Sequence, residues 1–143
     1  MCTISIARHS GGIRVVCNRD ERRDRSAALA PAEYPIGATG RALFPRDPDG
    51  GGTWIGVNRA GLVAAMLNRN SGPHEGQIGS GFRRTSSSRH PTSRGIIVPF
   101  LLQFERAADA LAHLERLSAT SFAPFRVVLV DGRFTWTAAG GGG

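Results

Sequence analysis

Alternating apolar and polar residues open the chain and predict a β-hairpin. Thr3–Ala7 alternates isoleucines with small polar residues, Ser10–Gly12 supplies a turn, and Ile13–Cys17 returns as a second strand. Antiparallel pairing in this order brings the end of the second strand back to the start of the first. We therefore expect Asn18 and Asp20 to lie close to residue 2.

A second hairpin follows in the middle of the chain. The turn Asn58–Gly61 lies between a strand predicted over residues 51–57 and a buried return strand over Leu62–Leu67. The return strand ends at Asn68. This second polar residue at a strand end is a candidate neighbour for the residues at the end of the first hairpin.

Apolar residues then occur at helical spacing. Ile96–Phe104 and Glu105–Leu117 predict one or two helices, and Pro99 limits the first of them to a short turn or a kink. A third hairpin is predicted from strands over residues 124–131 and 133–137. Hairpins interrupted by helices predict an α+β fold, in which antiparallel sheets carry helices packed on one face.

Three stretches follow neither pattern. Residues 22–49 are polar and contain four prolines, so we expect a loop with little regular structure. Residues 69–91 are rich in Gly, Ser and Arg, and we expect disorder in their middle, at 79–90. We predict a single domain over residues 1–138 and a disordered glycine tail over 139–143.

The composition narrows the function classes. The 143 residues suffice for one domain with a real core. A net charge of +7 favours nucleic acid as a partner, but all eighteen basic residues are arginines and the few aromatics are not interleaved with them, so this interpretation ranks low. No apolar run is long enough to cross a bilayer and no secretory signal pattern opens the chain. We therefore expect a cytoplasmic protein with free cysteines.

Cys2 is the first candidate for chemistry. Removal of Met1 would leave a thiol and a free α-amine on one residue, and an α-amine with a reference pKa of about 7.7–8.0 can act as the general base for that thiol. On position alone, a small buried apolar residue at the head of a strand is the favoured interpretation.

Two polar residues at strand ends strengthen the case for Cys2. Asp20 could orient the α-amine, and the amide of Asn68 could donate to a developing oxyanion, an interaction typically worth about 2.7–4 kcal/mol in the transition state. Both residue types also occur in ordinary turns. Three candidate groups at the ends of neighbouring strands could form a common site, so both the functional and the structural interpretations stay open.

Further residues are candidates for binding a substrate. They are Asn18, Arg19 and Trp54: Arg19 could bind a carboxylate of the substrate or of the protein itself, and Trp54 could form a pocket wall or belong to the core. The four histidines and two cysteines have no metal-ligand spacing. We therefore predict no metal site and no cofactor.

The candidate residues fall within motifs of a known family. In chain order the matching segments are Met1-Cys2-Thr3, Asn18-Arg19-Asp20-Glu21 with Arg25, Arg46-Asp47, Gly51-Gly52-Thr53-Trp54-Ile55-Gly56, Ala65-Met66-Leu67-Asn68-Arg69 and Ser93-Arg94-Gly95. In these segments the chain resembles the NRDE family, also called the transport and Golgi organisation 2 family. More distantly, it is similar to the cysteine branch of the N-terminal nucleophile hydrolases.

The distant similarity implies both a fold and an activity. The fold would be the N-terminal part of an αββα sandwich, incomplete relative to longer relatives. By resemblance, Cys2 would be the nucleophile of an amidohydrolase that acts on a C–N amide bond of a small molecule, Asp20 would orient its α-amine, and Asn68 would donate to the oxyanion. Those hydrolases have an arginine where this chain has Cys17, and Arg19 is the candidate that replaces it.

The family also implies an alternative without catalysis. Its eukaryotic members are associated with Golgi organisation, secretion and haem trafficking. On that reading the protein would carry a small molecule or haem, with Cys2 or His9 as a possible iron ligand.

Overall fold

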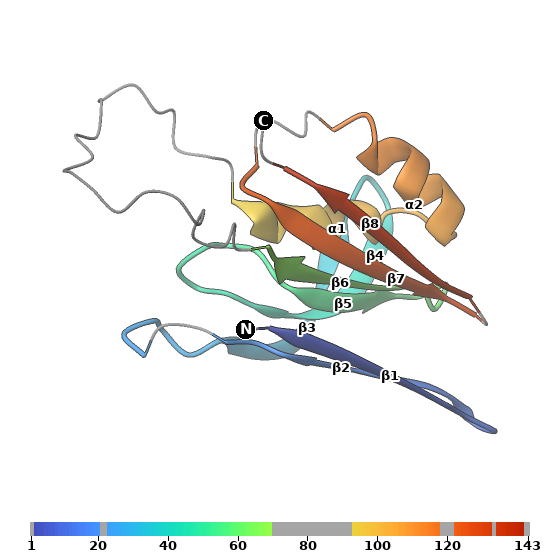
Figure 1. The fold of residues 1–143 in the computed structure, drawn as a ribbon, viewed down its shortest axis with the longest axis horizontal. Helices are drawn as coiled ribbons and strands as arrows, with labels where there is room; N and C mark the ends of the chain where they lie inside the picture. The colour runs from blue at the N-terminus through green and yellow to red at the C-terminus, as the bar shows by residue number, and fades with distance from the viewer. Residues whose placement is uncertain (1, 21–22, 70–92, 118–121, 133, 142–143) are drawn as a thin grey trace, which may run out of the picture.

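The computed structural model of the protein describes residues 2–20, 23–69, 93–117, 122–132 and 134–141 (Figure 1). Its elements are, in chain order, β1 (Thr3–His9), β2 (Gly12–Asn18), β3 (Leu29–Ile36), β4 (Gly40–Arg46), β5 (Ile55–Asn58), β6 (Val63–Asn68), the 3-10 helix η1 (Arg94–Ile96), α1 (Ile97–Leu101), α2 (Ala107–Leu114), β7 (Phe125–Asp131) and β8 (Phe134–Gly140). The strands form a two-stranded sheet, β1-β2, and a six-stranded sheet of order β3-β4-β5-β6-β7-β8. These mostly antiparallel sheets with short helices confirm the predicted α+β class.

The six-stranded sheet forms the middle layer of the molecule. Along β7, Phe125, Val127 and Leu129 belong to the core that also contains the buried residues of α1 and α2. Val128 and Val130 are buried as well but point to the opposite face, because side chains alternate along a strand. Figure 1 shows the helices on one side of this sheet and the β1–β2 hairpin on the other.

The first hairpin has the predicted register. Thr3 pairs with Asn18 at one end, and His9 pairs with Gly12 at the turn. Arg8 ties the hairpin to the larger sheet, because its guanidinium donates to the carbonyl of Gly132 and to the hydroxyl of Thr135, both at 3.2 Å. The residues that alternate toward the larger sheet are half-buried, and they include Cys2, Ile4, Ile6, Ile13, Val15 and Cys17.

The prediction of a loop with little regular structure over residues 22–49 is wrong, since β3 and β4 form a hairpin there. The four prolines of this segment favoured a loop, because proline lacks the N–H that a central strand donates to its neighbours. Pro31 and Pro35 lie in β3, which is an edge strand with one side unpaired. Pro45 lies in β4 beyond Ala42 and Leu43, the residues that pair with β5.

Two other boundaries also differ from the prediction. The strand expected from residue 51 begins at Ile55, since Gly51 adopts a positive φ of 70° within a loop. The prediction of a disordered tail over residues 139–143 is wrong for Ala139 and Gly140. These two residues pair with Arg126 and Phe125 as the end of β8. A Cβ on Gly140 would lie 2.7 Å from the ring of Phe125, so the absence of a side chain lets β8 continue across that ring.

Other predictions hold or fall outside the described residues. The hairpin around Asn58–Gly61, the two helices and the final hairpin are confirmed as β5–β6, α1 with α2, and β7–β8. Pro99 lies in the first turn of the five-residue α1, where its missing N–H costs no helical hydrogen bond. The disorder predicted over 79–90 lies outside the described residues. Within the described part of the chain, no helix has the length and apolar character required to cross a bilayer.

Candidate active site

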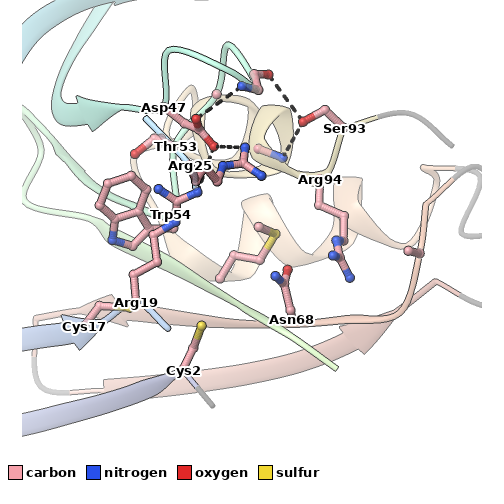
Figure 2. Close-up of a pocket in the computed structure, with 15 residues that line it drawn as sticks. Cys2, Cys17, Arg19, Arg25, Asp47, Thr53, Trp54, Asn68, Ser93 and Arg94 are labelled. Atoms are coloured by element: carbon pink, nitrogen blue, oxygen red, sulfur yellow. Dashed lines mark hydrogen bonds and ion pairs between the residues drawn. The ribbon is translucent and has the colours of Figure 1, made fainter. Parts of the chain in front are cut away.

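A pocket of about 240 Å³ opens beside the N-terminal end of β1 (Figure 2). Its lining residues are Cys2, Cys17, Arg19, Arg25, Asp47, Gly50, Gly52, Thr53, Trp54, Met66, Asn68, Ser93, Arg94, Gly95 and Ala123. They come from the residue before β1, the end of β2 and the segment after it, the loop before β5, the end of β6, the start of η1 and the residues before β7. The volume lies just below the roughly 300–1,000 Å³ of common ligand pockets, so the pocket suits a small molecule or one end of a larger molecule.

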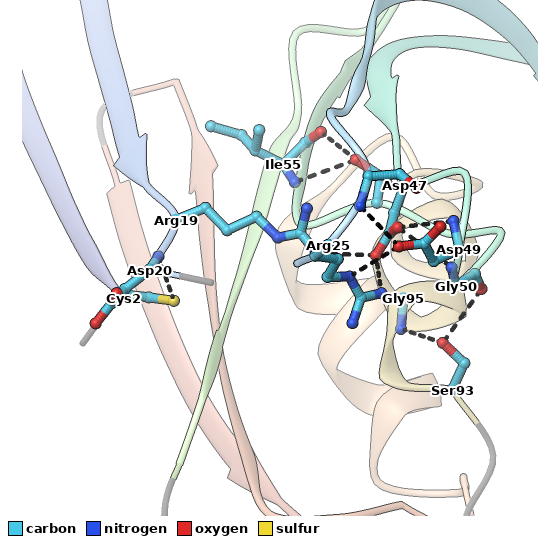
Figure 3. A network of polar contacts seen from close by, with 12 residues as sticks. Cys2, Arg19, Asp20, Arg25, Asp47, Asp49, Gly50, Ile55, Ser93 and Gly95 are labelled. Atoms are coloured by element: carbon cyan, nitrogen blue, oxygen red, sulfur yellow. Dashed lines mark hydrogen bonds and ion pairs between the residues drawn. The ribbon is translucent and has the colours of Figure 1, made fainter. Parts of the chain in front are cut away.

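The hairpin register brings Cys2 next to the residues that follow β2. Because Thr3 pairs with Asn18, Cys2 lies beside Arg19 and Asp20. The backbone N–H of Asp20 donates to the Cys2 sulfur at 3.5 Å (Figure 3). Asp20 therefore reaches Cys2 through its backbone, and its side chain is exposed outside the pocket lining.

Asn68 reaches the same pocket from the six-stranded sheet. It is the last residue of β6, and Figure 2 shows its amide and the Cys2 sulfur pointing into the pocket. Asn18 is exposed and is not among the described lining residues. Of the predicted site residues, the structure thus places Cys2, Arg19, Trp54 and Asn68 in one pocket.

Arg19 binds a carboxylate of the protein itself. Its Nη2 donates to Oδ2 of Asp47 at 2.8 Å, and its guanidinium carbon lies 4.5 Å from the centre of the Trp54 ring. The ion pair and the cation–π contact hold Arg19 between Asp47 and Trp54. Trp54 in turn forms a wall of the pocket.

Asp47 is the centre of the polar network in Figure 3. It is 7% exposed and accepts hydrogen bonds from Arg19, Arg25 and the backbone N–H groups of Asp49 and Gly50. Burial alone raises the pKa of Asp47. The hydrogen bonds from Gly50 and Asp49, the charge of Arg19 and the hydrogen bond from Arg25 outweigh burial and lower this pKa below its ordinary value.

Hydrogen bonds from the backbone and from the Ser93 hydroxyl join the loop before β5 to the start of η1. The N–H of Thr53 donates to the carbonyl of Gly95 at 3.0 Å. The hydroxyl of Ser93 donates to the carbonyl of Gly50 at 3.4 Å and accepts from the N–H of Gly95 at 3.3 Å. These contacts fix the side of the pocket opposite the first hairpin.

Gly52→Ala is expected to lower the free energy of unfolding by about 1–3 kcal/mol. A Cβ on Gly52 would lie 2.5 Å from Cα of Gly95, and backbone atoms cannot rotate out of the way. Urea denaturation measures the loss. Gly11→Ala is the control, because a Cβ there would approach only the His9 ring, at 3.5 Å, and the expected change is within about 0.5 kcal/mol. Equal stability of the two variants would contradict the packing argument.

Cys17 is the second thiol of the pocket. Burial, and then the nearby Cys2, raise the pKa of the Cys17 thiol, so Cys17 stays protonated at neutral pH. Within the described ranges, no group of three or more His, Cys, Asp or Glu side chains is placed to hold a metal ion.

Site residues that sequence reasoning did not single out include Arg25, Asp47, Ser93 and Arg94. Arg94 donates from Nη1 to the carbonyl of Pro124 at 2.8 Å and lines the pocket beside Asn68. The motif segments in which these residues occur were the only sequence signal that could have found them.

Comparisons with known proteins identify the family. No curated protein and no solved structure matches the chain. The family model described as Transport and Golgi organisation 2 matches residues 1–139, nearly the whole chain. The protein therefore belongs to the Transport and Golgi organisation 2 family.

Proposed function

We propose that the protein is a cysteine N-terminal nucleophile hydrolase that cleaves a C–N amide bond of a small molecule. The proposal rests on one observation: the sulfur of Cys2 and the amide of Asn68 share a single pocket. A nucleophile and an oxyanion donor must converge on one carbonyl group, and these two side chains come from different sheets. The proposal also requires removal of Met1, which frees the α-amine of Cys2.

The first half of the reaction forms a thioester. The α-amine of Cys2 takes the thiol proton as sulfur attacks the carbonyl carbon, and Asn68 donates to the oxyanion that develops. The C–N bond then breaks, and the leaving nitrogen takes the proton from the α-ammonium. The N–H of Asp20, which donates to the sulfur at 3.5 Å, supports the negative charge of the thiolate.

The second half releases the acid. The same α-amine takes a proton from water, the resulting hydroxide attacks the thioester carbon, and the C–S bond breaks. The thiolate takes back the proton, and a carboxylic acid leaves. Arg19 and Asp47 act as positioning residues, because their ion pair and the contact of Arg19 with Trp54 hold the pocket wall.

The order of the layers supports the proposed relationship to the N-terminal nucleophile hydrolases. A helical layer, a six-stranded sheet and a hairpin stacked on the far face of that sheet correspond to three layers of an αββα sandwich. We propose that this part of the chain has the N-terminal-nucleophile-hydrolase architecture, with the pocket at the end of the two facing sheets.

Iodoacetamide labelling with intact-protein mass spectrometry tests the proposal. We expect a mature protein without Met1 and selective alkylation of Cys2 at neutral pH, because the raised pKa of Cys17 leaves little of its reactive thiolate. Cys17→Ala should keep the label and Cys2→Ala should lose it. Met1 retained on the purified protein would exclude this mechanism.

A further inference from the structure

Arginine side chains dominate the charge of the pocket that contains Cys2. Three arginines line it: Arg19, Arg25 and Arg94. Asp47 is the one carboxylate among its described lining residues, and Arg19 and Arg25 both bind its Oδ2. Outside the lining, Asp49 lies 3.8 Å from Arg25 and adds a second negative charge to this network. The two carboxylates balance the first two arginines, so Arg94 gives the described wall of the pocket its positive excess.

Arg94 is held beside the proposed oxyanion donor. The carbonyl of Pro124 accepts from Nη1 of Arg94 at 2.8 Å and from the backbone N–H of Arg69 at 3.1 Å. Arg69 directly follows Asn68, so one carbonyl ties the guanidinium to the strand end that carries the Asn68 amide. Figure 2 shows both side chains lining the same part of the pocket. Because a carbonyl is neutral, this contact fixes the guanidinium without cancelling its charge.

The backbone on both sides of Arg94 is fixed as well. Ser93 donates to the carbonyl of Gly50, and the carbonyl of Gly95 accepts from the N–H of Thr53. A charged group that is held in place before binding loses little conformational entropy when a ligand arrives. Arg94 therefore has the features of a positioned anion-binding group.

We propose that the substrate of this pocket is an amide that carries a carboxylate, and that Arg94 binds the carboxylate. The inference rests on the proposed function, because it uses the same pocket as Cys2 and Asn68. The planar guanidinium matches the two oxygens of a carboxylate, and Trp54 and Met66 supply apolar surface for the rest of the molecule. Since Arg94 is tied to the strand end that carries Asn68, a carboxylate bound there brings the neighbouring amide carbonyl close to the oxyanion donor.

Alkylation of Cys2 by iodoacetate and by iodoacetamide tests the proposal without requiring turnover. The two reagents have nearly the same size and react with the same thiolate, but only iodoacetate carries a carboxylate. The ratio of their rate constants therefore cancels any change in the pKa of Cys2. In Cys17→Ala, Cys2 is the only thiol of the chain. Its iodoacetate-to-iodoacetamide ratio should exceed that of the neutral thiol 2-mercaptoethanol by about fivefold or more, and the excess should shrink as salt is added.

Variants in the Cys17→Ala background assign the effect to Arg94. Arg94→Gln should bring the ratio to within about twofold of that of 2-mercaptoethanol, whereas Arg94→Lys, which keeps the charge, should retain most of the excess. Arg59→Gln is the matched control, because it removes the same charge from a side chain that is 73% exposed at the turn between β5 and β6. It should leave the ratio unchanged. Circular dichroism checks that each variant folds.

The outcomes separate this inference from the proposed function. A Cys2 ratio equal to that of 2-mercaptoethanol, or the same raised ratio in Arg94→Gln, would overturn the carboxylate site. A raised ratio that depends on Arg94, in a protein that hydrolyses no amide, would support carboxylate binding and contradict the hydrolase mechanism alone.

Discussion

Cys2→Ala is expected to abolish amide hydrolysis, with a loss of about 10⁴-fold or more in kcat/KM on any amide that the wild type turns over. Cys17, the other thiol that lines the pocket, should not replace the attacking sulfur, because its raised pKa keeps it protonated at neutral pH. A panel of small acyl p-nitroanilides, followed by release of p-nitroaniline, provides the measurement. The wild type should also gain the mass of the acyl group during turnover, and the variant should not.

Asn68→Ala separates the oxyanion donor from the nucleophile. The loss of one donor should reduce kcat by about 10²–10³-fold, while iodoacetamide still labels Cys2 at the wild-type rate. Ser5→Ala is the matched control, since Ser5 is exposed on the outer side of the same hairpin as Cys2. Full activity in Cys2→Ala would refute the mechanism, and unchanged kcat in Asn68→Ala would remove Asn68 from it.

The placement of Cys2 beside Asp20 was predictable because it follows from local patterns, whereas the meeting of Cys2 with Asn68 depends on how the two sheets pack. Alternating apolar residues and short turns specify hairpins, and a hairpin register fixes which residues lie at the same end. The sequence pattern therefore placed Cys2 beside Asp20 before any coordinates were known. It did not determine that Asp20 meets the sulfur through its N–H, because that depends on how the chain leaves β2.

The polar network around Asp47 was not predictable in this way. Arg25 and Arg19 are 22 and 28 positions away from Asp47 along the chain, so neither helical nor strand periodicity relates them. The strands that bring them together, β3 and β4, were hidden by their prolines. The close approach of Gly52 to Gly95 likewise depends on tertiary packing, which no local pattern contains.

Asp47→Asn is expected to lower the free energy of unfolding at neutral pH by about 3 kcal/mol. The substitution keeps the size of the side chain but leaves the guanidiniums of Arg19 and Arg25 without their shared charged partner. Urea denaturation of both proteins measures the difference. Asp49→Asn is the matched control: its side chain is 41% exposed and lies 3.8 Å from Arg25, so its loss should cost less than about 1 kcal/mol.

The difference between wild type and Asp47→Asn should depend on pH in one direction. The pKa of Asp47 is lower in the folded protein than in the unfolded chain, so the folded state favours the ionised form. This contribution is complete above the unfolded-state pKa of about 3.9 and is lost as pH falls through the folded-state pKa. The stability gap should therefore be constant near neutrality and narrow below about pH 4. A gap that stays constant down to the acid unfolding transition would show that the ionisation of Asp47 does not cause the difference.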